Sequence, residues 1–170
     1  MGPLIYAIHH FEEHIIFNFR EWRLNYFLDN NSITTEEVLV RLISILLVLV
    51  FLHLIKNNRG SAHLVLFFMM TTQVVNAFFH IFFSIYFSDF SPGTITAVLL
   101  YLPINYLIIR AAFNERFING FLELFLLFIA GIITFTLFEI IGPQVIAFTL
   151  LLTPLYYILI NSMGSRIDND

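Results

Sequence analysis

The sequence predicts an all-α polytopic membrane protein, a bundle of about six helices, and three observations support this prediction. Hydrophobic residues make up 59% of the 170 residues and charged residues only 12%, whereas a soluble domain typically has about 25% charged residues. The mean hydropathy is +0.86. Five stretches approach the roughly 20 apolar residues that a helix needs to cross a bilayer. We therefore expect a single transmembrane domain over residues 1–170, surrounded by membrane lipid.

The composition also narrows the functions to consider. The net charge is -4, and no basic stripe of the kind that nucleic acid needs is present, so we expect no nucleic-acid partner. The chain has no cysteine, which excludes disulfides, thiolate metal ligands and a cysteine nucleophile.

Turn and capping signals separate the five apolar segments. The pattern Thr34-Thr35-Glu36-Glu37 is typical of a helix start, and a polar turn at residues 56–61 precedes the second segment. Ser91-Pro92-Gly93 precedes the third, in which Pro103 is an expected kink, and Gly142-Pro143 ends the fourth. The predicted helices cover residues 36–55, 62–87, 93–112, 120–141 and 144–161.

Residues 3–27 form the remaining candidate helix, whose hydropathy is lowered by polar residues near its centre, among them His9, His10, Glu12, Glu13 and His14. The segment either spans the membrane with its polar face inside the bundle or lies in the interface as an amphipathic helix. The polar residues in the first half of this segment are His and Glu, whereas an interfacial helix is typically rich in Lys and Arg. We therefore favour the spanning helix. The prediction is therefore six helices.

The basic residues predict the orientation of this six-helix arrangement, since cytoplasmic loops are enriched in Lys and Arg. Arg20 and Arg23 fall on one side of the membrane, with Arg41 just inside it. The other side carries five basic residues: Lys56, Arg59, Arg110, Arg116 and Arg166. We expect both termini to be cytoplasmic.

Two polar stripes are predicted to meet inside the bundle. His9, Glu12 and Glu13 share a helix face because residues three and four apart point the same way. A charge at mid-bilayer costs roughly 2.5–3.5 kcal/mol on insertion scales, so two adjacent carboxylates there require a partner. Asn76 and His80 are four residues apart on another helix and also share a face. They are the natural partners of the first stripe.

Three interpretations of these residues are open. A divalent metal (Zn, Fe or Mn) held by His9, Glu12, Glu13 and His80 would activate a water molecule for hydrolysis. Without a metal, neighbouring carboxylates with separated pKa values could act as acid and base in an isomerase or cyclase. The third interpretation is a proton-coupled carrier or a lipid-binding membrane protein.

We favour metal-assisted hydrolysis because two His and two Glu make a sufficient ligand set. Glu12, Glu13 and Asn76 are then the predicted catalytic residues. Glu13 would serve as ligand or base, and Asn76 would orient a ligand or the substrate. The expected substrate is a lipid or isoprenoid-like small molecule that enters sideways from the bilayer.

The segment His9-His10-Phe11-Glu12-Glu13 resembles the His-x-x-Glu-Glu signature of the HXXEE-domain family of uncharacterised integral membrane proteins. Asn76 and His80 are similar to the downstream Asn and His of that family, and Ser91-Pro92-Gly93 is similar to its Ser-Pro-Gly stretch. The resemblance covers about the first two-thirds of the chain. It implies that His9, Glu12, Glu13 and His80 form one site, for which we expect an enzymatic role.

Overall fold

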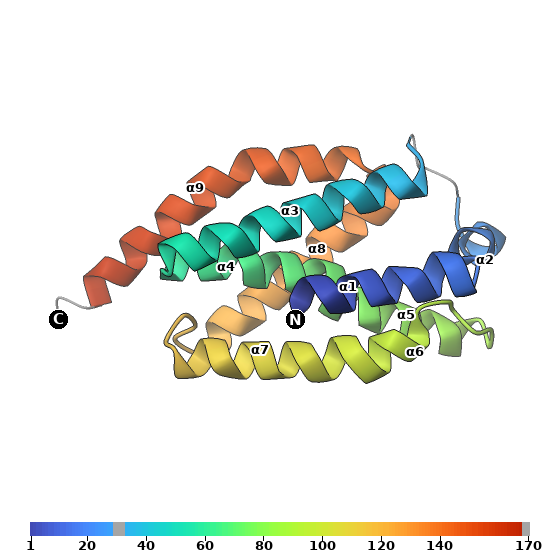
Figure 1. The fold of residues 1–170 in the computed structure, drawn as a ribbon, viewed down its shortest axis with the longest axis horizontal. Coiled ribbons are helices and arrows are strands. Elements are labelled where there is room, and N and C mark those ends of the chain that lie inside the picture. The colour runs from blue at the N-terminus through green and yellow to red at the C-terminus, as the bar shows by residue number, and fades with distance from the viewer. Residues whose placement is uncertain (29–32, 168–170) are drawn as a thin grey trace.

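The predicted membrane-spanning segments are long helices in the structure, a computed structural model that describes residues 1–28 and 33–167 and the side chains up to residue 162. All regular structure in this part of the chain is helical. Five helices are long and apolar enough to cross a membrane: Thr35–Lys56, Arg59–Tyr86, Thr94–Asn114, Phe121–Ile141 and Gln144–Ser162. Figure 1 shows them running up and down beside one another. The prediction of an all-α membrane helix bundle is confirmed.

The helix ends follow the local sequence. Helix α3 (Thr35–Lys56) begins after Thr34, whose side chain accepts a hydrogen bond from the Glu37 N–H. Helix α4 (Arg59–Met69) begins with a capping box in which Asn58 and Ser61 exchange hydrogen bonds between side chain and backbone. Helix α8 (Phe121–Ile141) ends at Gly142 before helix α9 (Gln144–Ile167) begins.

Three of the helices contain a π-helical turn, a feature that is frequent at functional sites. Turn η1 (Glu12–Ile16) continues helix α1 (Gly2–Phe11). Turn η2 (Met70–Val75) joins α4 to helix α5 (Asn76–Tyr86), so that these three elements form one long helix. Turn η3 (Ala97–Tyr101) joins the short helix α6 (Thr94–Thr96) to helix α7 (Leu102–Asn114). Pro103, the predicted kink, is the second residue of α7, two positions after the end of this turn.

The N-terminal segment differs from the prediction of one helix over residues 3–27. It forms α1 with η1 and then a separate helix α2 (Phe19–Tyr26). The break lies at Phe17, which is extended, and at Asn18, whose side chain caps α2 by accepting from the Glu21 N–H. Helix α1 begins part-way along the bundle, and α2 lies across one end of it (Figure 1). The first segment is therefore not a single helix that runs the length of the bundle.

Buried amides fix where α1 begins. The Gln73 side-chain N–H donates to the Gly2 carbonyl at 3.2 Å, and the Asn105 side chain donates to Gln73 Oε1 at 2.9 Å. Ile5 and Tyr6 pack in a core cluster with residues of α3, α4, α5 and η3. Polar side chains can join helices in this way inside a membrane protein. Gln73 thus acts as a bridge between helices.

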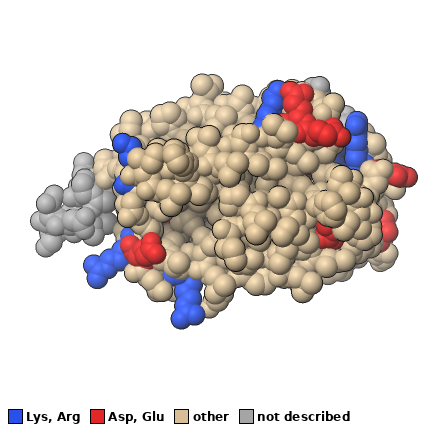
Figure 2. Space-filling model, viewed as in Figure 1, with Lys and Arg blue, Asp and Glu red and all other residues tan. Residues whose placement is uncertain are grey.

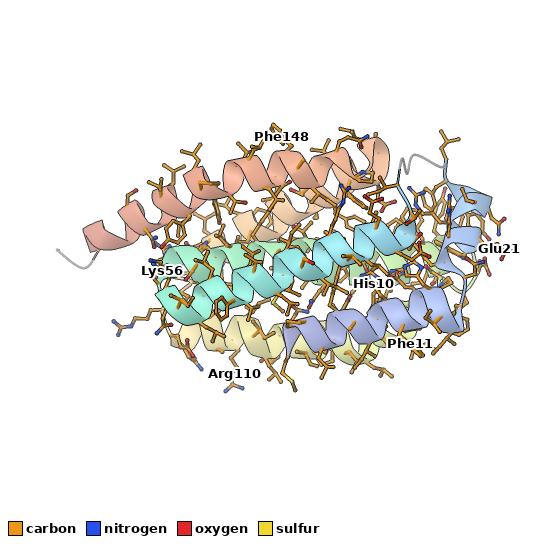
Figure 3. All side chains as sticks on the ribbon, turned by 45° about the horizontal axis from the view of Figure 1, so that its top comes forward. His10, Phe11, Glu21, Lys56, Arg110 and Phe148 are labelled. Carbon is orange, nitrogen blue, oxygen red and sulfur yellow. The ribbon has the colours of Figure 1, made fainter. Side chains whose placement is uncertain are left out.

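The surface divides into an apolar middle and two charged ends. In Figure 2 the charged side chains gather at both ends of the molecule, with other residues between them. Figure 3 places Lys56 and Arg110 at one end and Glu21 at the other. Arg166 was one of the basic residues used to predict the orientation, and its side chain lies outside the described residues. This distribution fits a bundle whose middle is surrounded by lipid.

Candidate metal centre

Three residues from α1, η1 and α5 meet in the interior at the end of the bundle near α2. Oε1 of Glu13 lies 3.3 Å from His9 Nε2 and 2.9 Å from His80 Nε2. The exposed fractions of His9, Glu13 and His80 are 0%, 2% and 0%. With metal–ligand bonds of about 2.0–2.1 Å, neighbouring ligands of a tetrahedral zinc ion lie about 3.3 Å apart. These three ligand atoms can therefore hold a metal ion.

Hydroxyl groups hold the other nitrogen of each histidine ring. His9 Nδ1 lies 2.8 Å from Thr96 Oγ1, and His80 Nδ1 lies 2.9 Å from Ser91 Oγ. The Thr96 hydroxyl donates to the Gly93 carbonyl at 3.3 Å. The hydrogen between His9 and Thr96 therefore comes from the histidine, and in a neutral imidazole the Nε2 atom then carries a lone pair. Metal-binding histidines are usually fixed in this way.

The Nε2 atoms of His9 and His80 are buried, and each of them faces Oε1 of Glu13. Neither makes a hydrogen bond of normal geometry, although buried polar atoms in proteins are nearly always paired. A neutral His9 would turn a nitrogen lone pair toward the carboxylate oxygen, which is unfavourable unless a proton or a metal cation lies between them. The donor set of two imidazoles and one carboxylate suits Zn, Fe or Mn.

Gly93 allows the two histidines and Glu13 to approach the loop before α6. A Cβ atom at this position would lie 2.8 Å from His9 Cε1 and 3.0 Å from both Glu13 Cγ and His80 Cε1. Its φ of +98° is also a conformation that favours glycine. Ser91, Gly93 and Thr96 were not predicted as site residues. The Ser-Pro-Gly stretch was the available signal, but spacing alone did not reveal its contact with the histidines.

Glu12 has a different environment from its neighbour. Its Oε1 accepts from the N–H groups of Gly93 and Ile95, both at 3.2 Å, and its Oε2 accepts from the Thr96 N–H at 2.7 Å. A carboxylate here satisfies the free N–H groups at the start of a helix and complements its dipole. The structure does not bring Glu12, a predicted ligand and catalytic residue, into the group of His9, Glu13 and His80.

Glu12→Gln is expected to destabilise the fold by about 1–3 kcal/mol, because the neutral amide replaces one acceptor oxygen with a donor beside buried N–H groups. Metal binding should persist, since His9, Glu13 and His80 are unchanged. Unfolding in mixed micelles and elemental analysis of the purified variant check the two halves of this prediction. Loss of the metal with unaltered stability would contradict it.

A cavity of about 180 Å³ lies beside this group, between the N-terminal helices, α3, η2, α8 and α9. Leu42, Ile45 and Phe68 contribute to its apolar wall. Glu13 is the one member of the three-residue group that lines it. The other acidic, basic and histidine side chains in its wall gather near α2: His10, His14, Arg20, Arg23 and Glu139. The cavity is thus apolar along most of its wall and polar at one end.

Asn76, the third predicted catalytic residue, lines the cavity rather than joining the three-residue group. Its Oδ1 atom is buried and has no hydrogen-bond partner. Arg23 pairs with Glu139 at 3.1 Å, which ties α2 to the end of α8. The cavity wall therefore combines a fixed ion pair with an amide oxygen that can accept a hydrogen bond.

Comparison with known proteins shows the family to which the chain belongs. Residues 1–108 match the model of a family described as "protein of unknown function with HXXEE motif". A search of curated proteins found no match, and neither did a search of solved structures. The matched region contains His9, Glu12, Glu13 and His80 as well as the Ser91-Pro92-Gly93 stretch. The chain belongs to this HXXEE family, whose motif places His9 and Glu13 in the buried group described above.

Proposed function

We propose that the protein is an integral-membrane hydrolase that uses a divalent metal, Zn, Fe or Mn, bound by His9, Glu13 and His80. The observation that carries the proposal is the pair of buried Nε2 atoms that converge on one oxygen of Glu13 without a hydrogen bond of normal geometry. Catalytic zinc sites commonly have three protein ligands and one open position. A metal in such a site lowers the pKa of a bound water and polarises the bond to be cleaved.

The cavity supports a lipid or isoprenoid-like substrate. Its apolar wall suits a hydrocarbon chain, while the polar side chains in the wall, which include Glu13 and Asn76, suit an ester or phosphate group. In the proposed reaction, the water oxygen bonds to the acyl carbon or phosphorus and the bond to the leaving oxygen breaks. The leaving alcohol takes a proton from the water. Asn76 Oδ1 would orient a donor group on the substrate or on the water.

The proposed location is a membrane with the Lys56 and Arg110 end of the bundle in the cytoplasm. This end also carries Arg59 and Arg116, and the rule that basic residues are cytoplasmic favours it. The His9–Glu13–His80 group would then lie nearer the opposite face, because the His80 ring packs against Phe19 of α2.

Metal content tests the proposal directly. The protein purified in detergent and loaded with Zn, Fe or Mn is expected to retain stoichiometric metal, measured by elemental mass spectrometry. His80→Ala should lose it. His63→Ala is the matched control: His63 is equally buried but bonds to Tyr156 and to the Phe117 carbonyl.

The loaded protein is also expected to cleave members of a panel of fatty-acyl, isoprenyl and phosphate esters. Well-folded protein that binds no metal would overturn the proposal and favour acid–base chemistry or transport. Equal metal content in His80→Ala and His63→Ala would overturn the assigned ligands.

A further inference from the structure

We infer that Glu13 bridges two divalent cations, and that His10 and His14 hold the second one on the side facing the cavity. The inference rests on the proposed function, because it adds a second position to the metal bound by His9, Glu13 and His80. It changes the place where the substrate would meet the metal centre.

The two oxygens of Glu13 have separate histidine pairs. Oε1 lies between His9 and His80, as described above. Oε2 lies 2.6 Å from His10 Nδ1 and 3.6 Å from His14 Nε2. The ligand atoms of His10, Glu13 and His14 all lie within 4.8 Å of one another. Each oxygen of a single carboxylate therefore faces two imidazoles, which is the donor arrangement that a bridging carboxylate requires.

His10 and His14, the second histidine pair, are held in place by their stacked rings and by their position on one helix. The rings of His10 and His14 stack with centroids 5.7 Å apart and an angle of 11° between their planes. Both residues lie on the same face because they are one helical turn apart, with His14 inside the π turn η1. Figure 3 shows His10 on the side of α1 that faces α3 and Phe11 on the other side. His10 Nε2 is a third buried nitrogen without a hydrogen-bond partner.

The two positions differ in access. His9 and His80 are fully buried and do not line the cavity, whereas His10, Glu13 and His14 all do. The side chains of His10 and His14 are 14% and 19% exposed. A cation at the second position can therefore bind water or a substrate oxygen from the cavity. A cation at the first position is enclosed by protein and would act through Glu13.

A second cation explains how a substrate in the cavity could bind to the metal centre directly. With one metal, the buried group touches the cavity through Glu13 alone, so the substrate would have to reach the metal past this side chain. Two cations bridged by one carboxylate, about 3.5–4 Å apart as in two-metal hydrolases, would place one of them at the cavity wall. In the structure His10 Nδ1 and Glu13 Oε2 are hydrogen-bonded at 2.6 Å, and a cation at the second position would replace this bond. The simpler alternative is that the hydrogen bond stays and no second cation binds.

Manganese distinguishes these alternatives because two bridged Mn²⁺ ions are magnetically coupled. The full chain in detergent is stripped with chelator, loaded with Mn²⁺ and desalted, and its manganese is measured by elemental mass spectrometry and electron paramagnetic resonance. We expect two ions per chain with a coupled spectrum. His14→Ala should fall to one ion with the six-line spectrum of isolated Mn²⁺, and His53→Ala should retain both ions.

The outcomes separate the inference from the proposed function. One ion in the unaltered chain, lost in His80→Ala and kept in His14→Ala, would overturn the second position and leave the single-metal hydrolase in place. No bound ion in folded protein would overturn both. Two coupled ions without cleavage of any ester would support the bridged centre while contradicting hydrolysis.

Discussion

Glu13→Gln is expected to abolish metal binding while preserving the fold. Glutamine keeps the shape of the side chain but removes the negative charge that faces His9, His10 and His80. Partners that merely orient a metal ligand contribute 10–100-fold to affinity, so loss of a direct ligand should cost at least about 100-fold. Elemental analysis and titration with Zn²⁺ measure the loss, and ester cleavage should fall to background.

Glu12→Gln is the control for this substitution, because it makes the same chemical change one residue away. It should weaken the fold and keep the metal, since Glu12 binds the N–H groups of Gly93, Ile95 and Thr96. Metal binding that survives Glu13→Gln would rule out Glu13 as a ligand. If both variants lost the metal equally, the distinct roles assigned to the two carboxylates would be wrong.

Gly93→Ala is expected to destabilise the protein by about 2–5 kcal/mol. About 1–2 kcal/mol comes from forcing a side chain into a left-handed backbone conformation, and about 1–3 kcal/mol from overpacking against His9, Glu13 and His80. The same contacts should displace the ligand atoms and lower the metal content. Unfolding in mixed micelles and elemental analysis measure these two effects.

Gly120→Ala is the matched control for Gly93→Ala. A Cβ atom at Gly120 would meet nothing within 4 Å, and its φ of 177° is extended backbone that any residue adopts. Its stability should stay within about 0.5 kcal/mol of the unaltered chain. Equal stability of the two alanine variants would show that the loop before α6 can move away from the histidines.

Hydropathy was sufficient to predict the long helices but not the N-terminal break. Each apolar segment is long, continuous and bounded by turn residues, so its signal does not depend on tertiary contacts. At Phe17 and Asn18 the first helix ends and α2 begins, with the Asn18 side chain as its cap. Asparagine is favoured at the start of a helix, but it also occurs inside helices, so the sequence alone did not mark this break.

The sequence predicted His80 as a partner of Glu13 but not the depth at which the two residues meet. Counting residues from the helix ends favours Asn76 at the level of Glu13 and places His80 deeper. In the structure α1 begins part-way along the bundle (Figure 1), so Glu13 reaches the level of His80 instead. The separation of Glu12 from Glu13 is likewise a tertiary effect, because the loop at Gly93 satisfies one carboxylate and leaves the other to the histidines.

The contacts between the first helix and residues 80–96 determine when this helix can settle in the bundle during synthesis. His9 bonds to Thr96, Glu12 to the backbone of residues 93–96, and Glu13 contacts His80. A charged side chain without a partner costs roughly 2.5–3.5 kcal/mol at the centre of a membrane helix. Residues 80–96 leave the ribosome well after the first helix, so this helix is made before its partners and can settle only once they have entered the bundle.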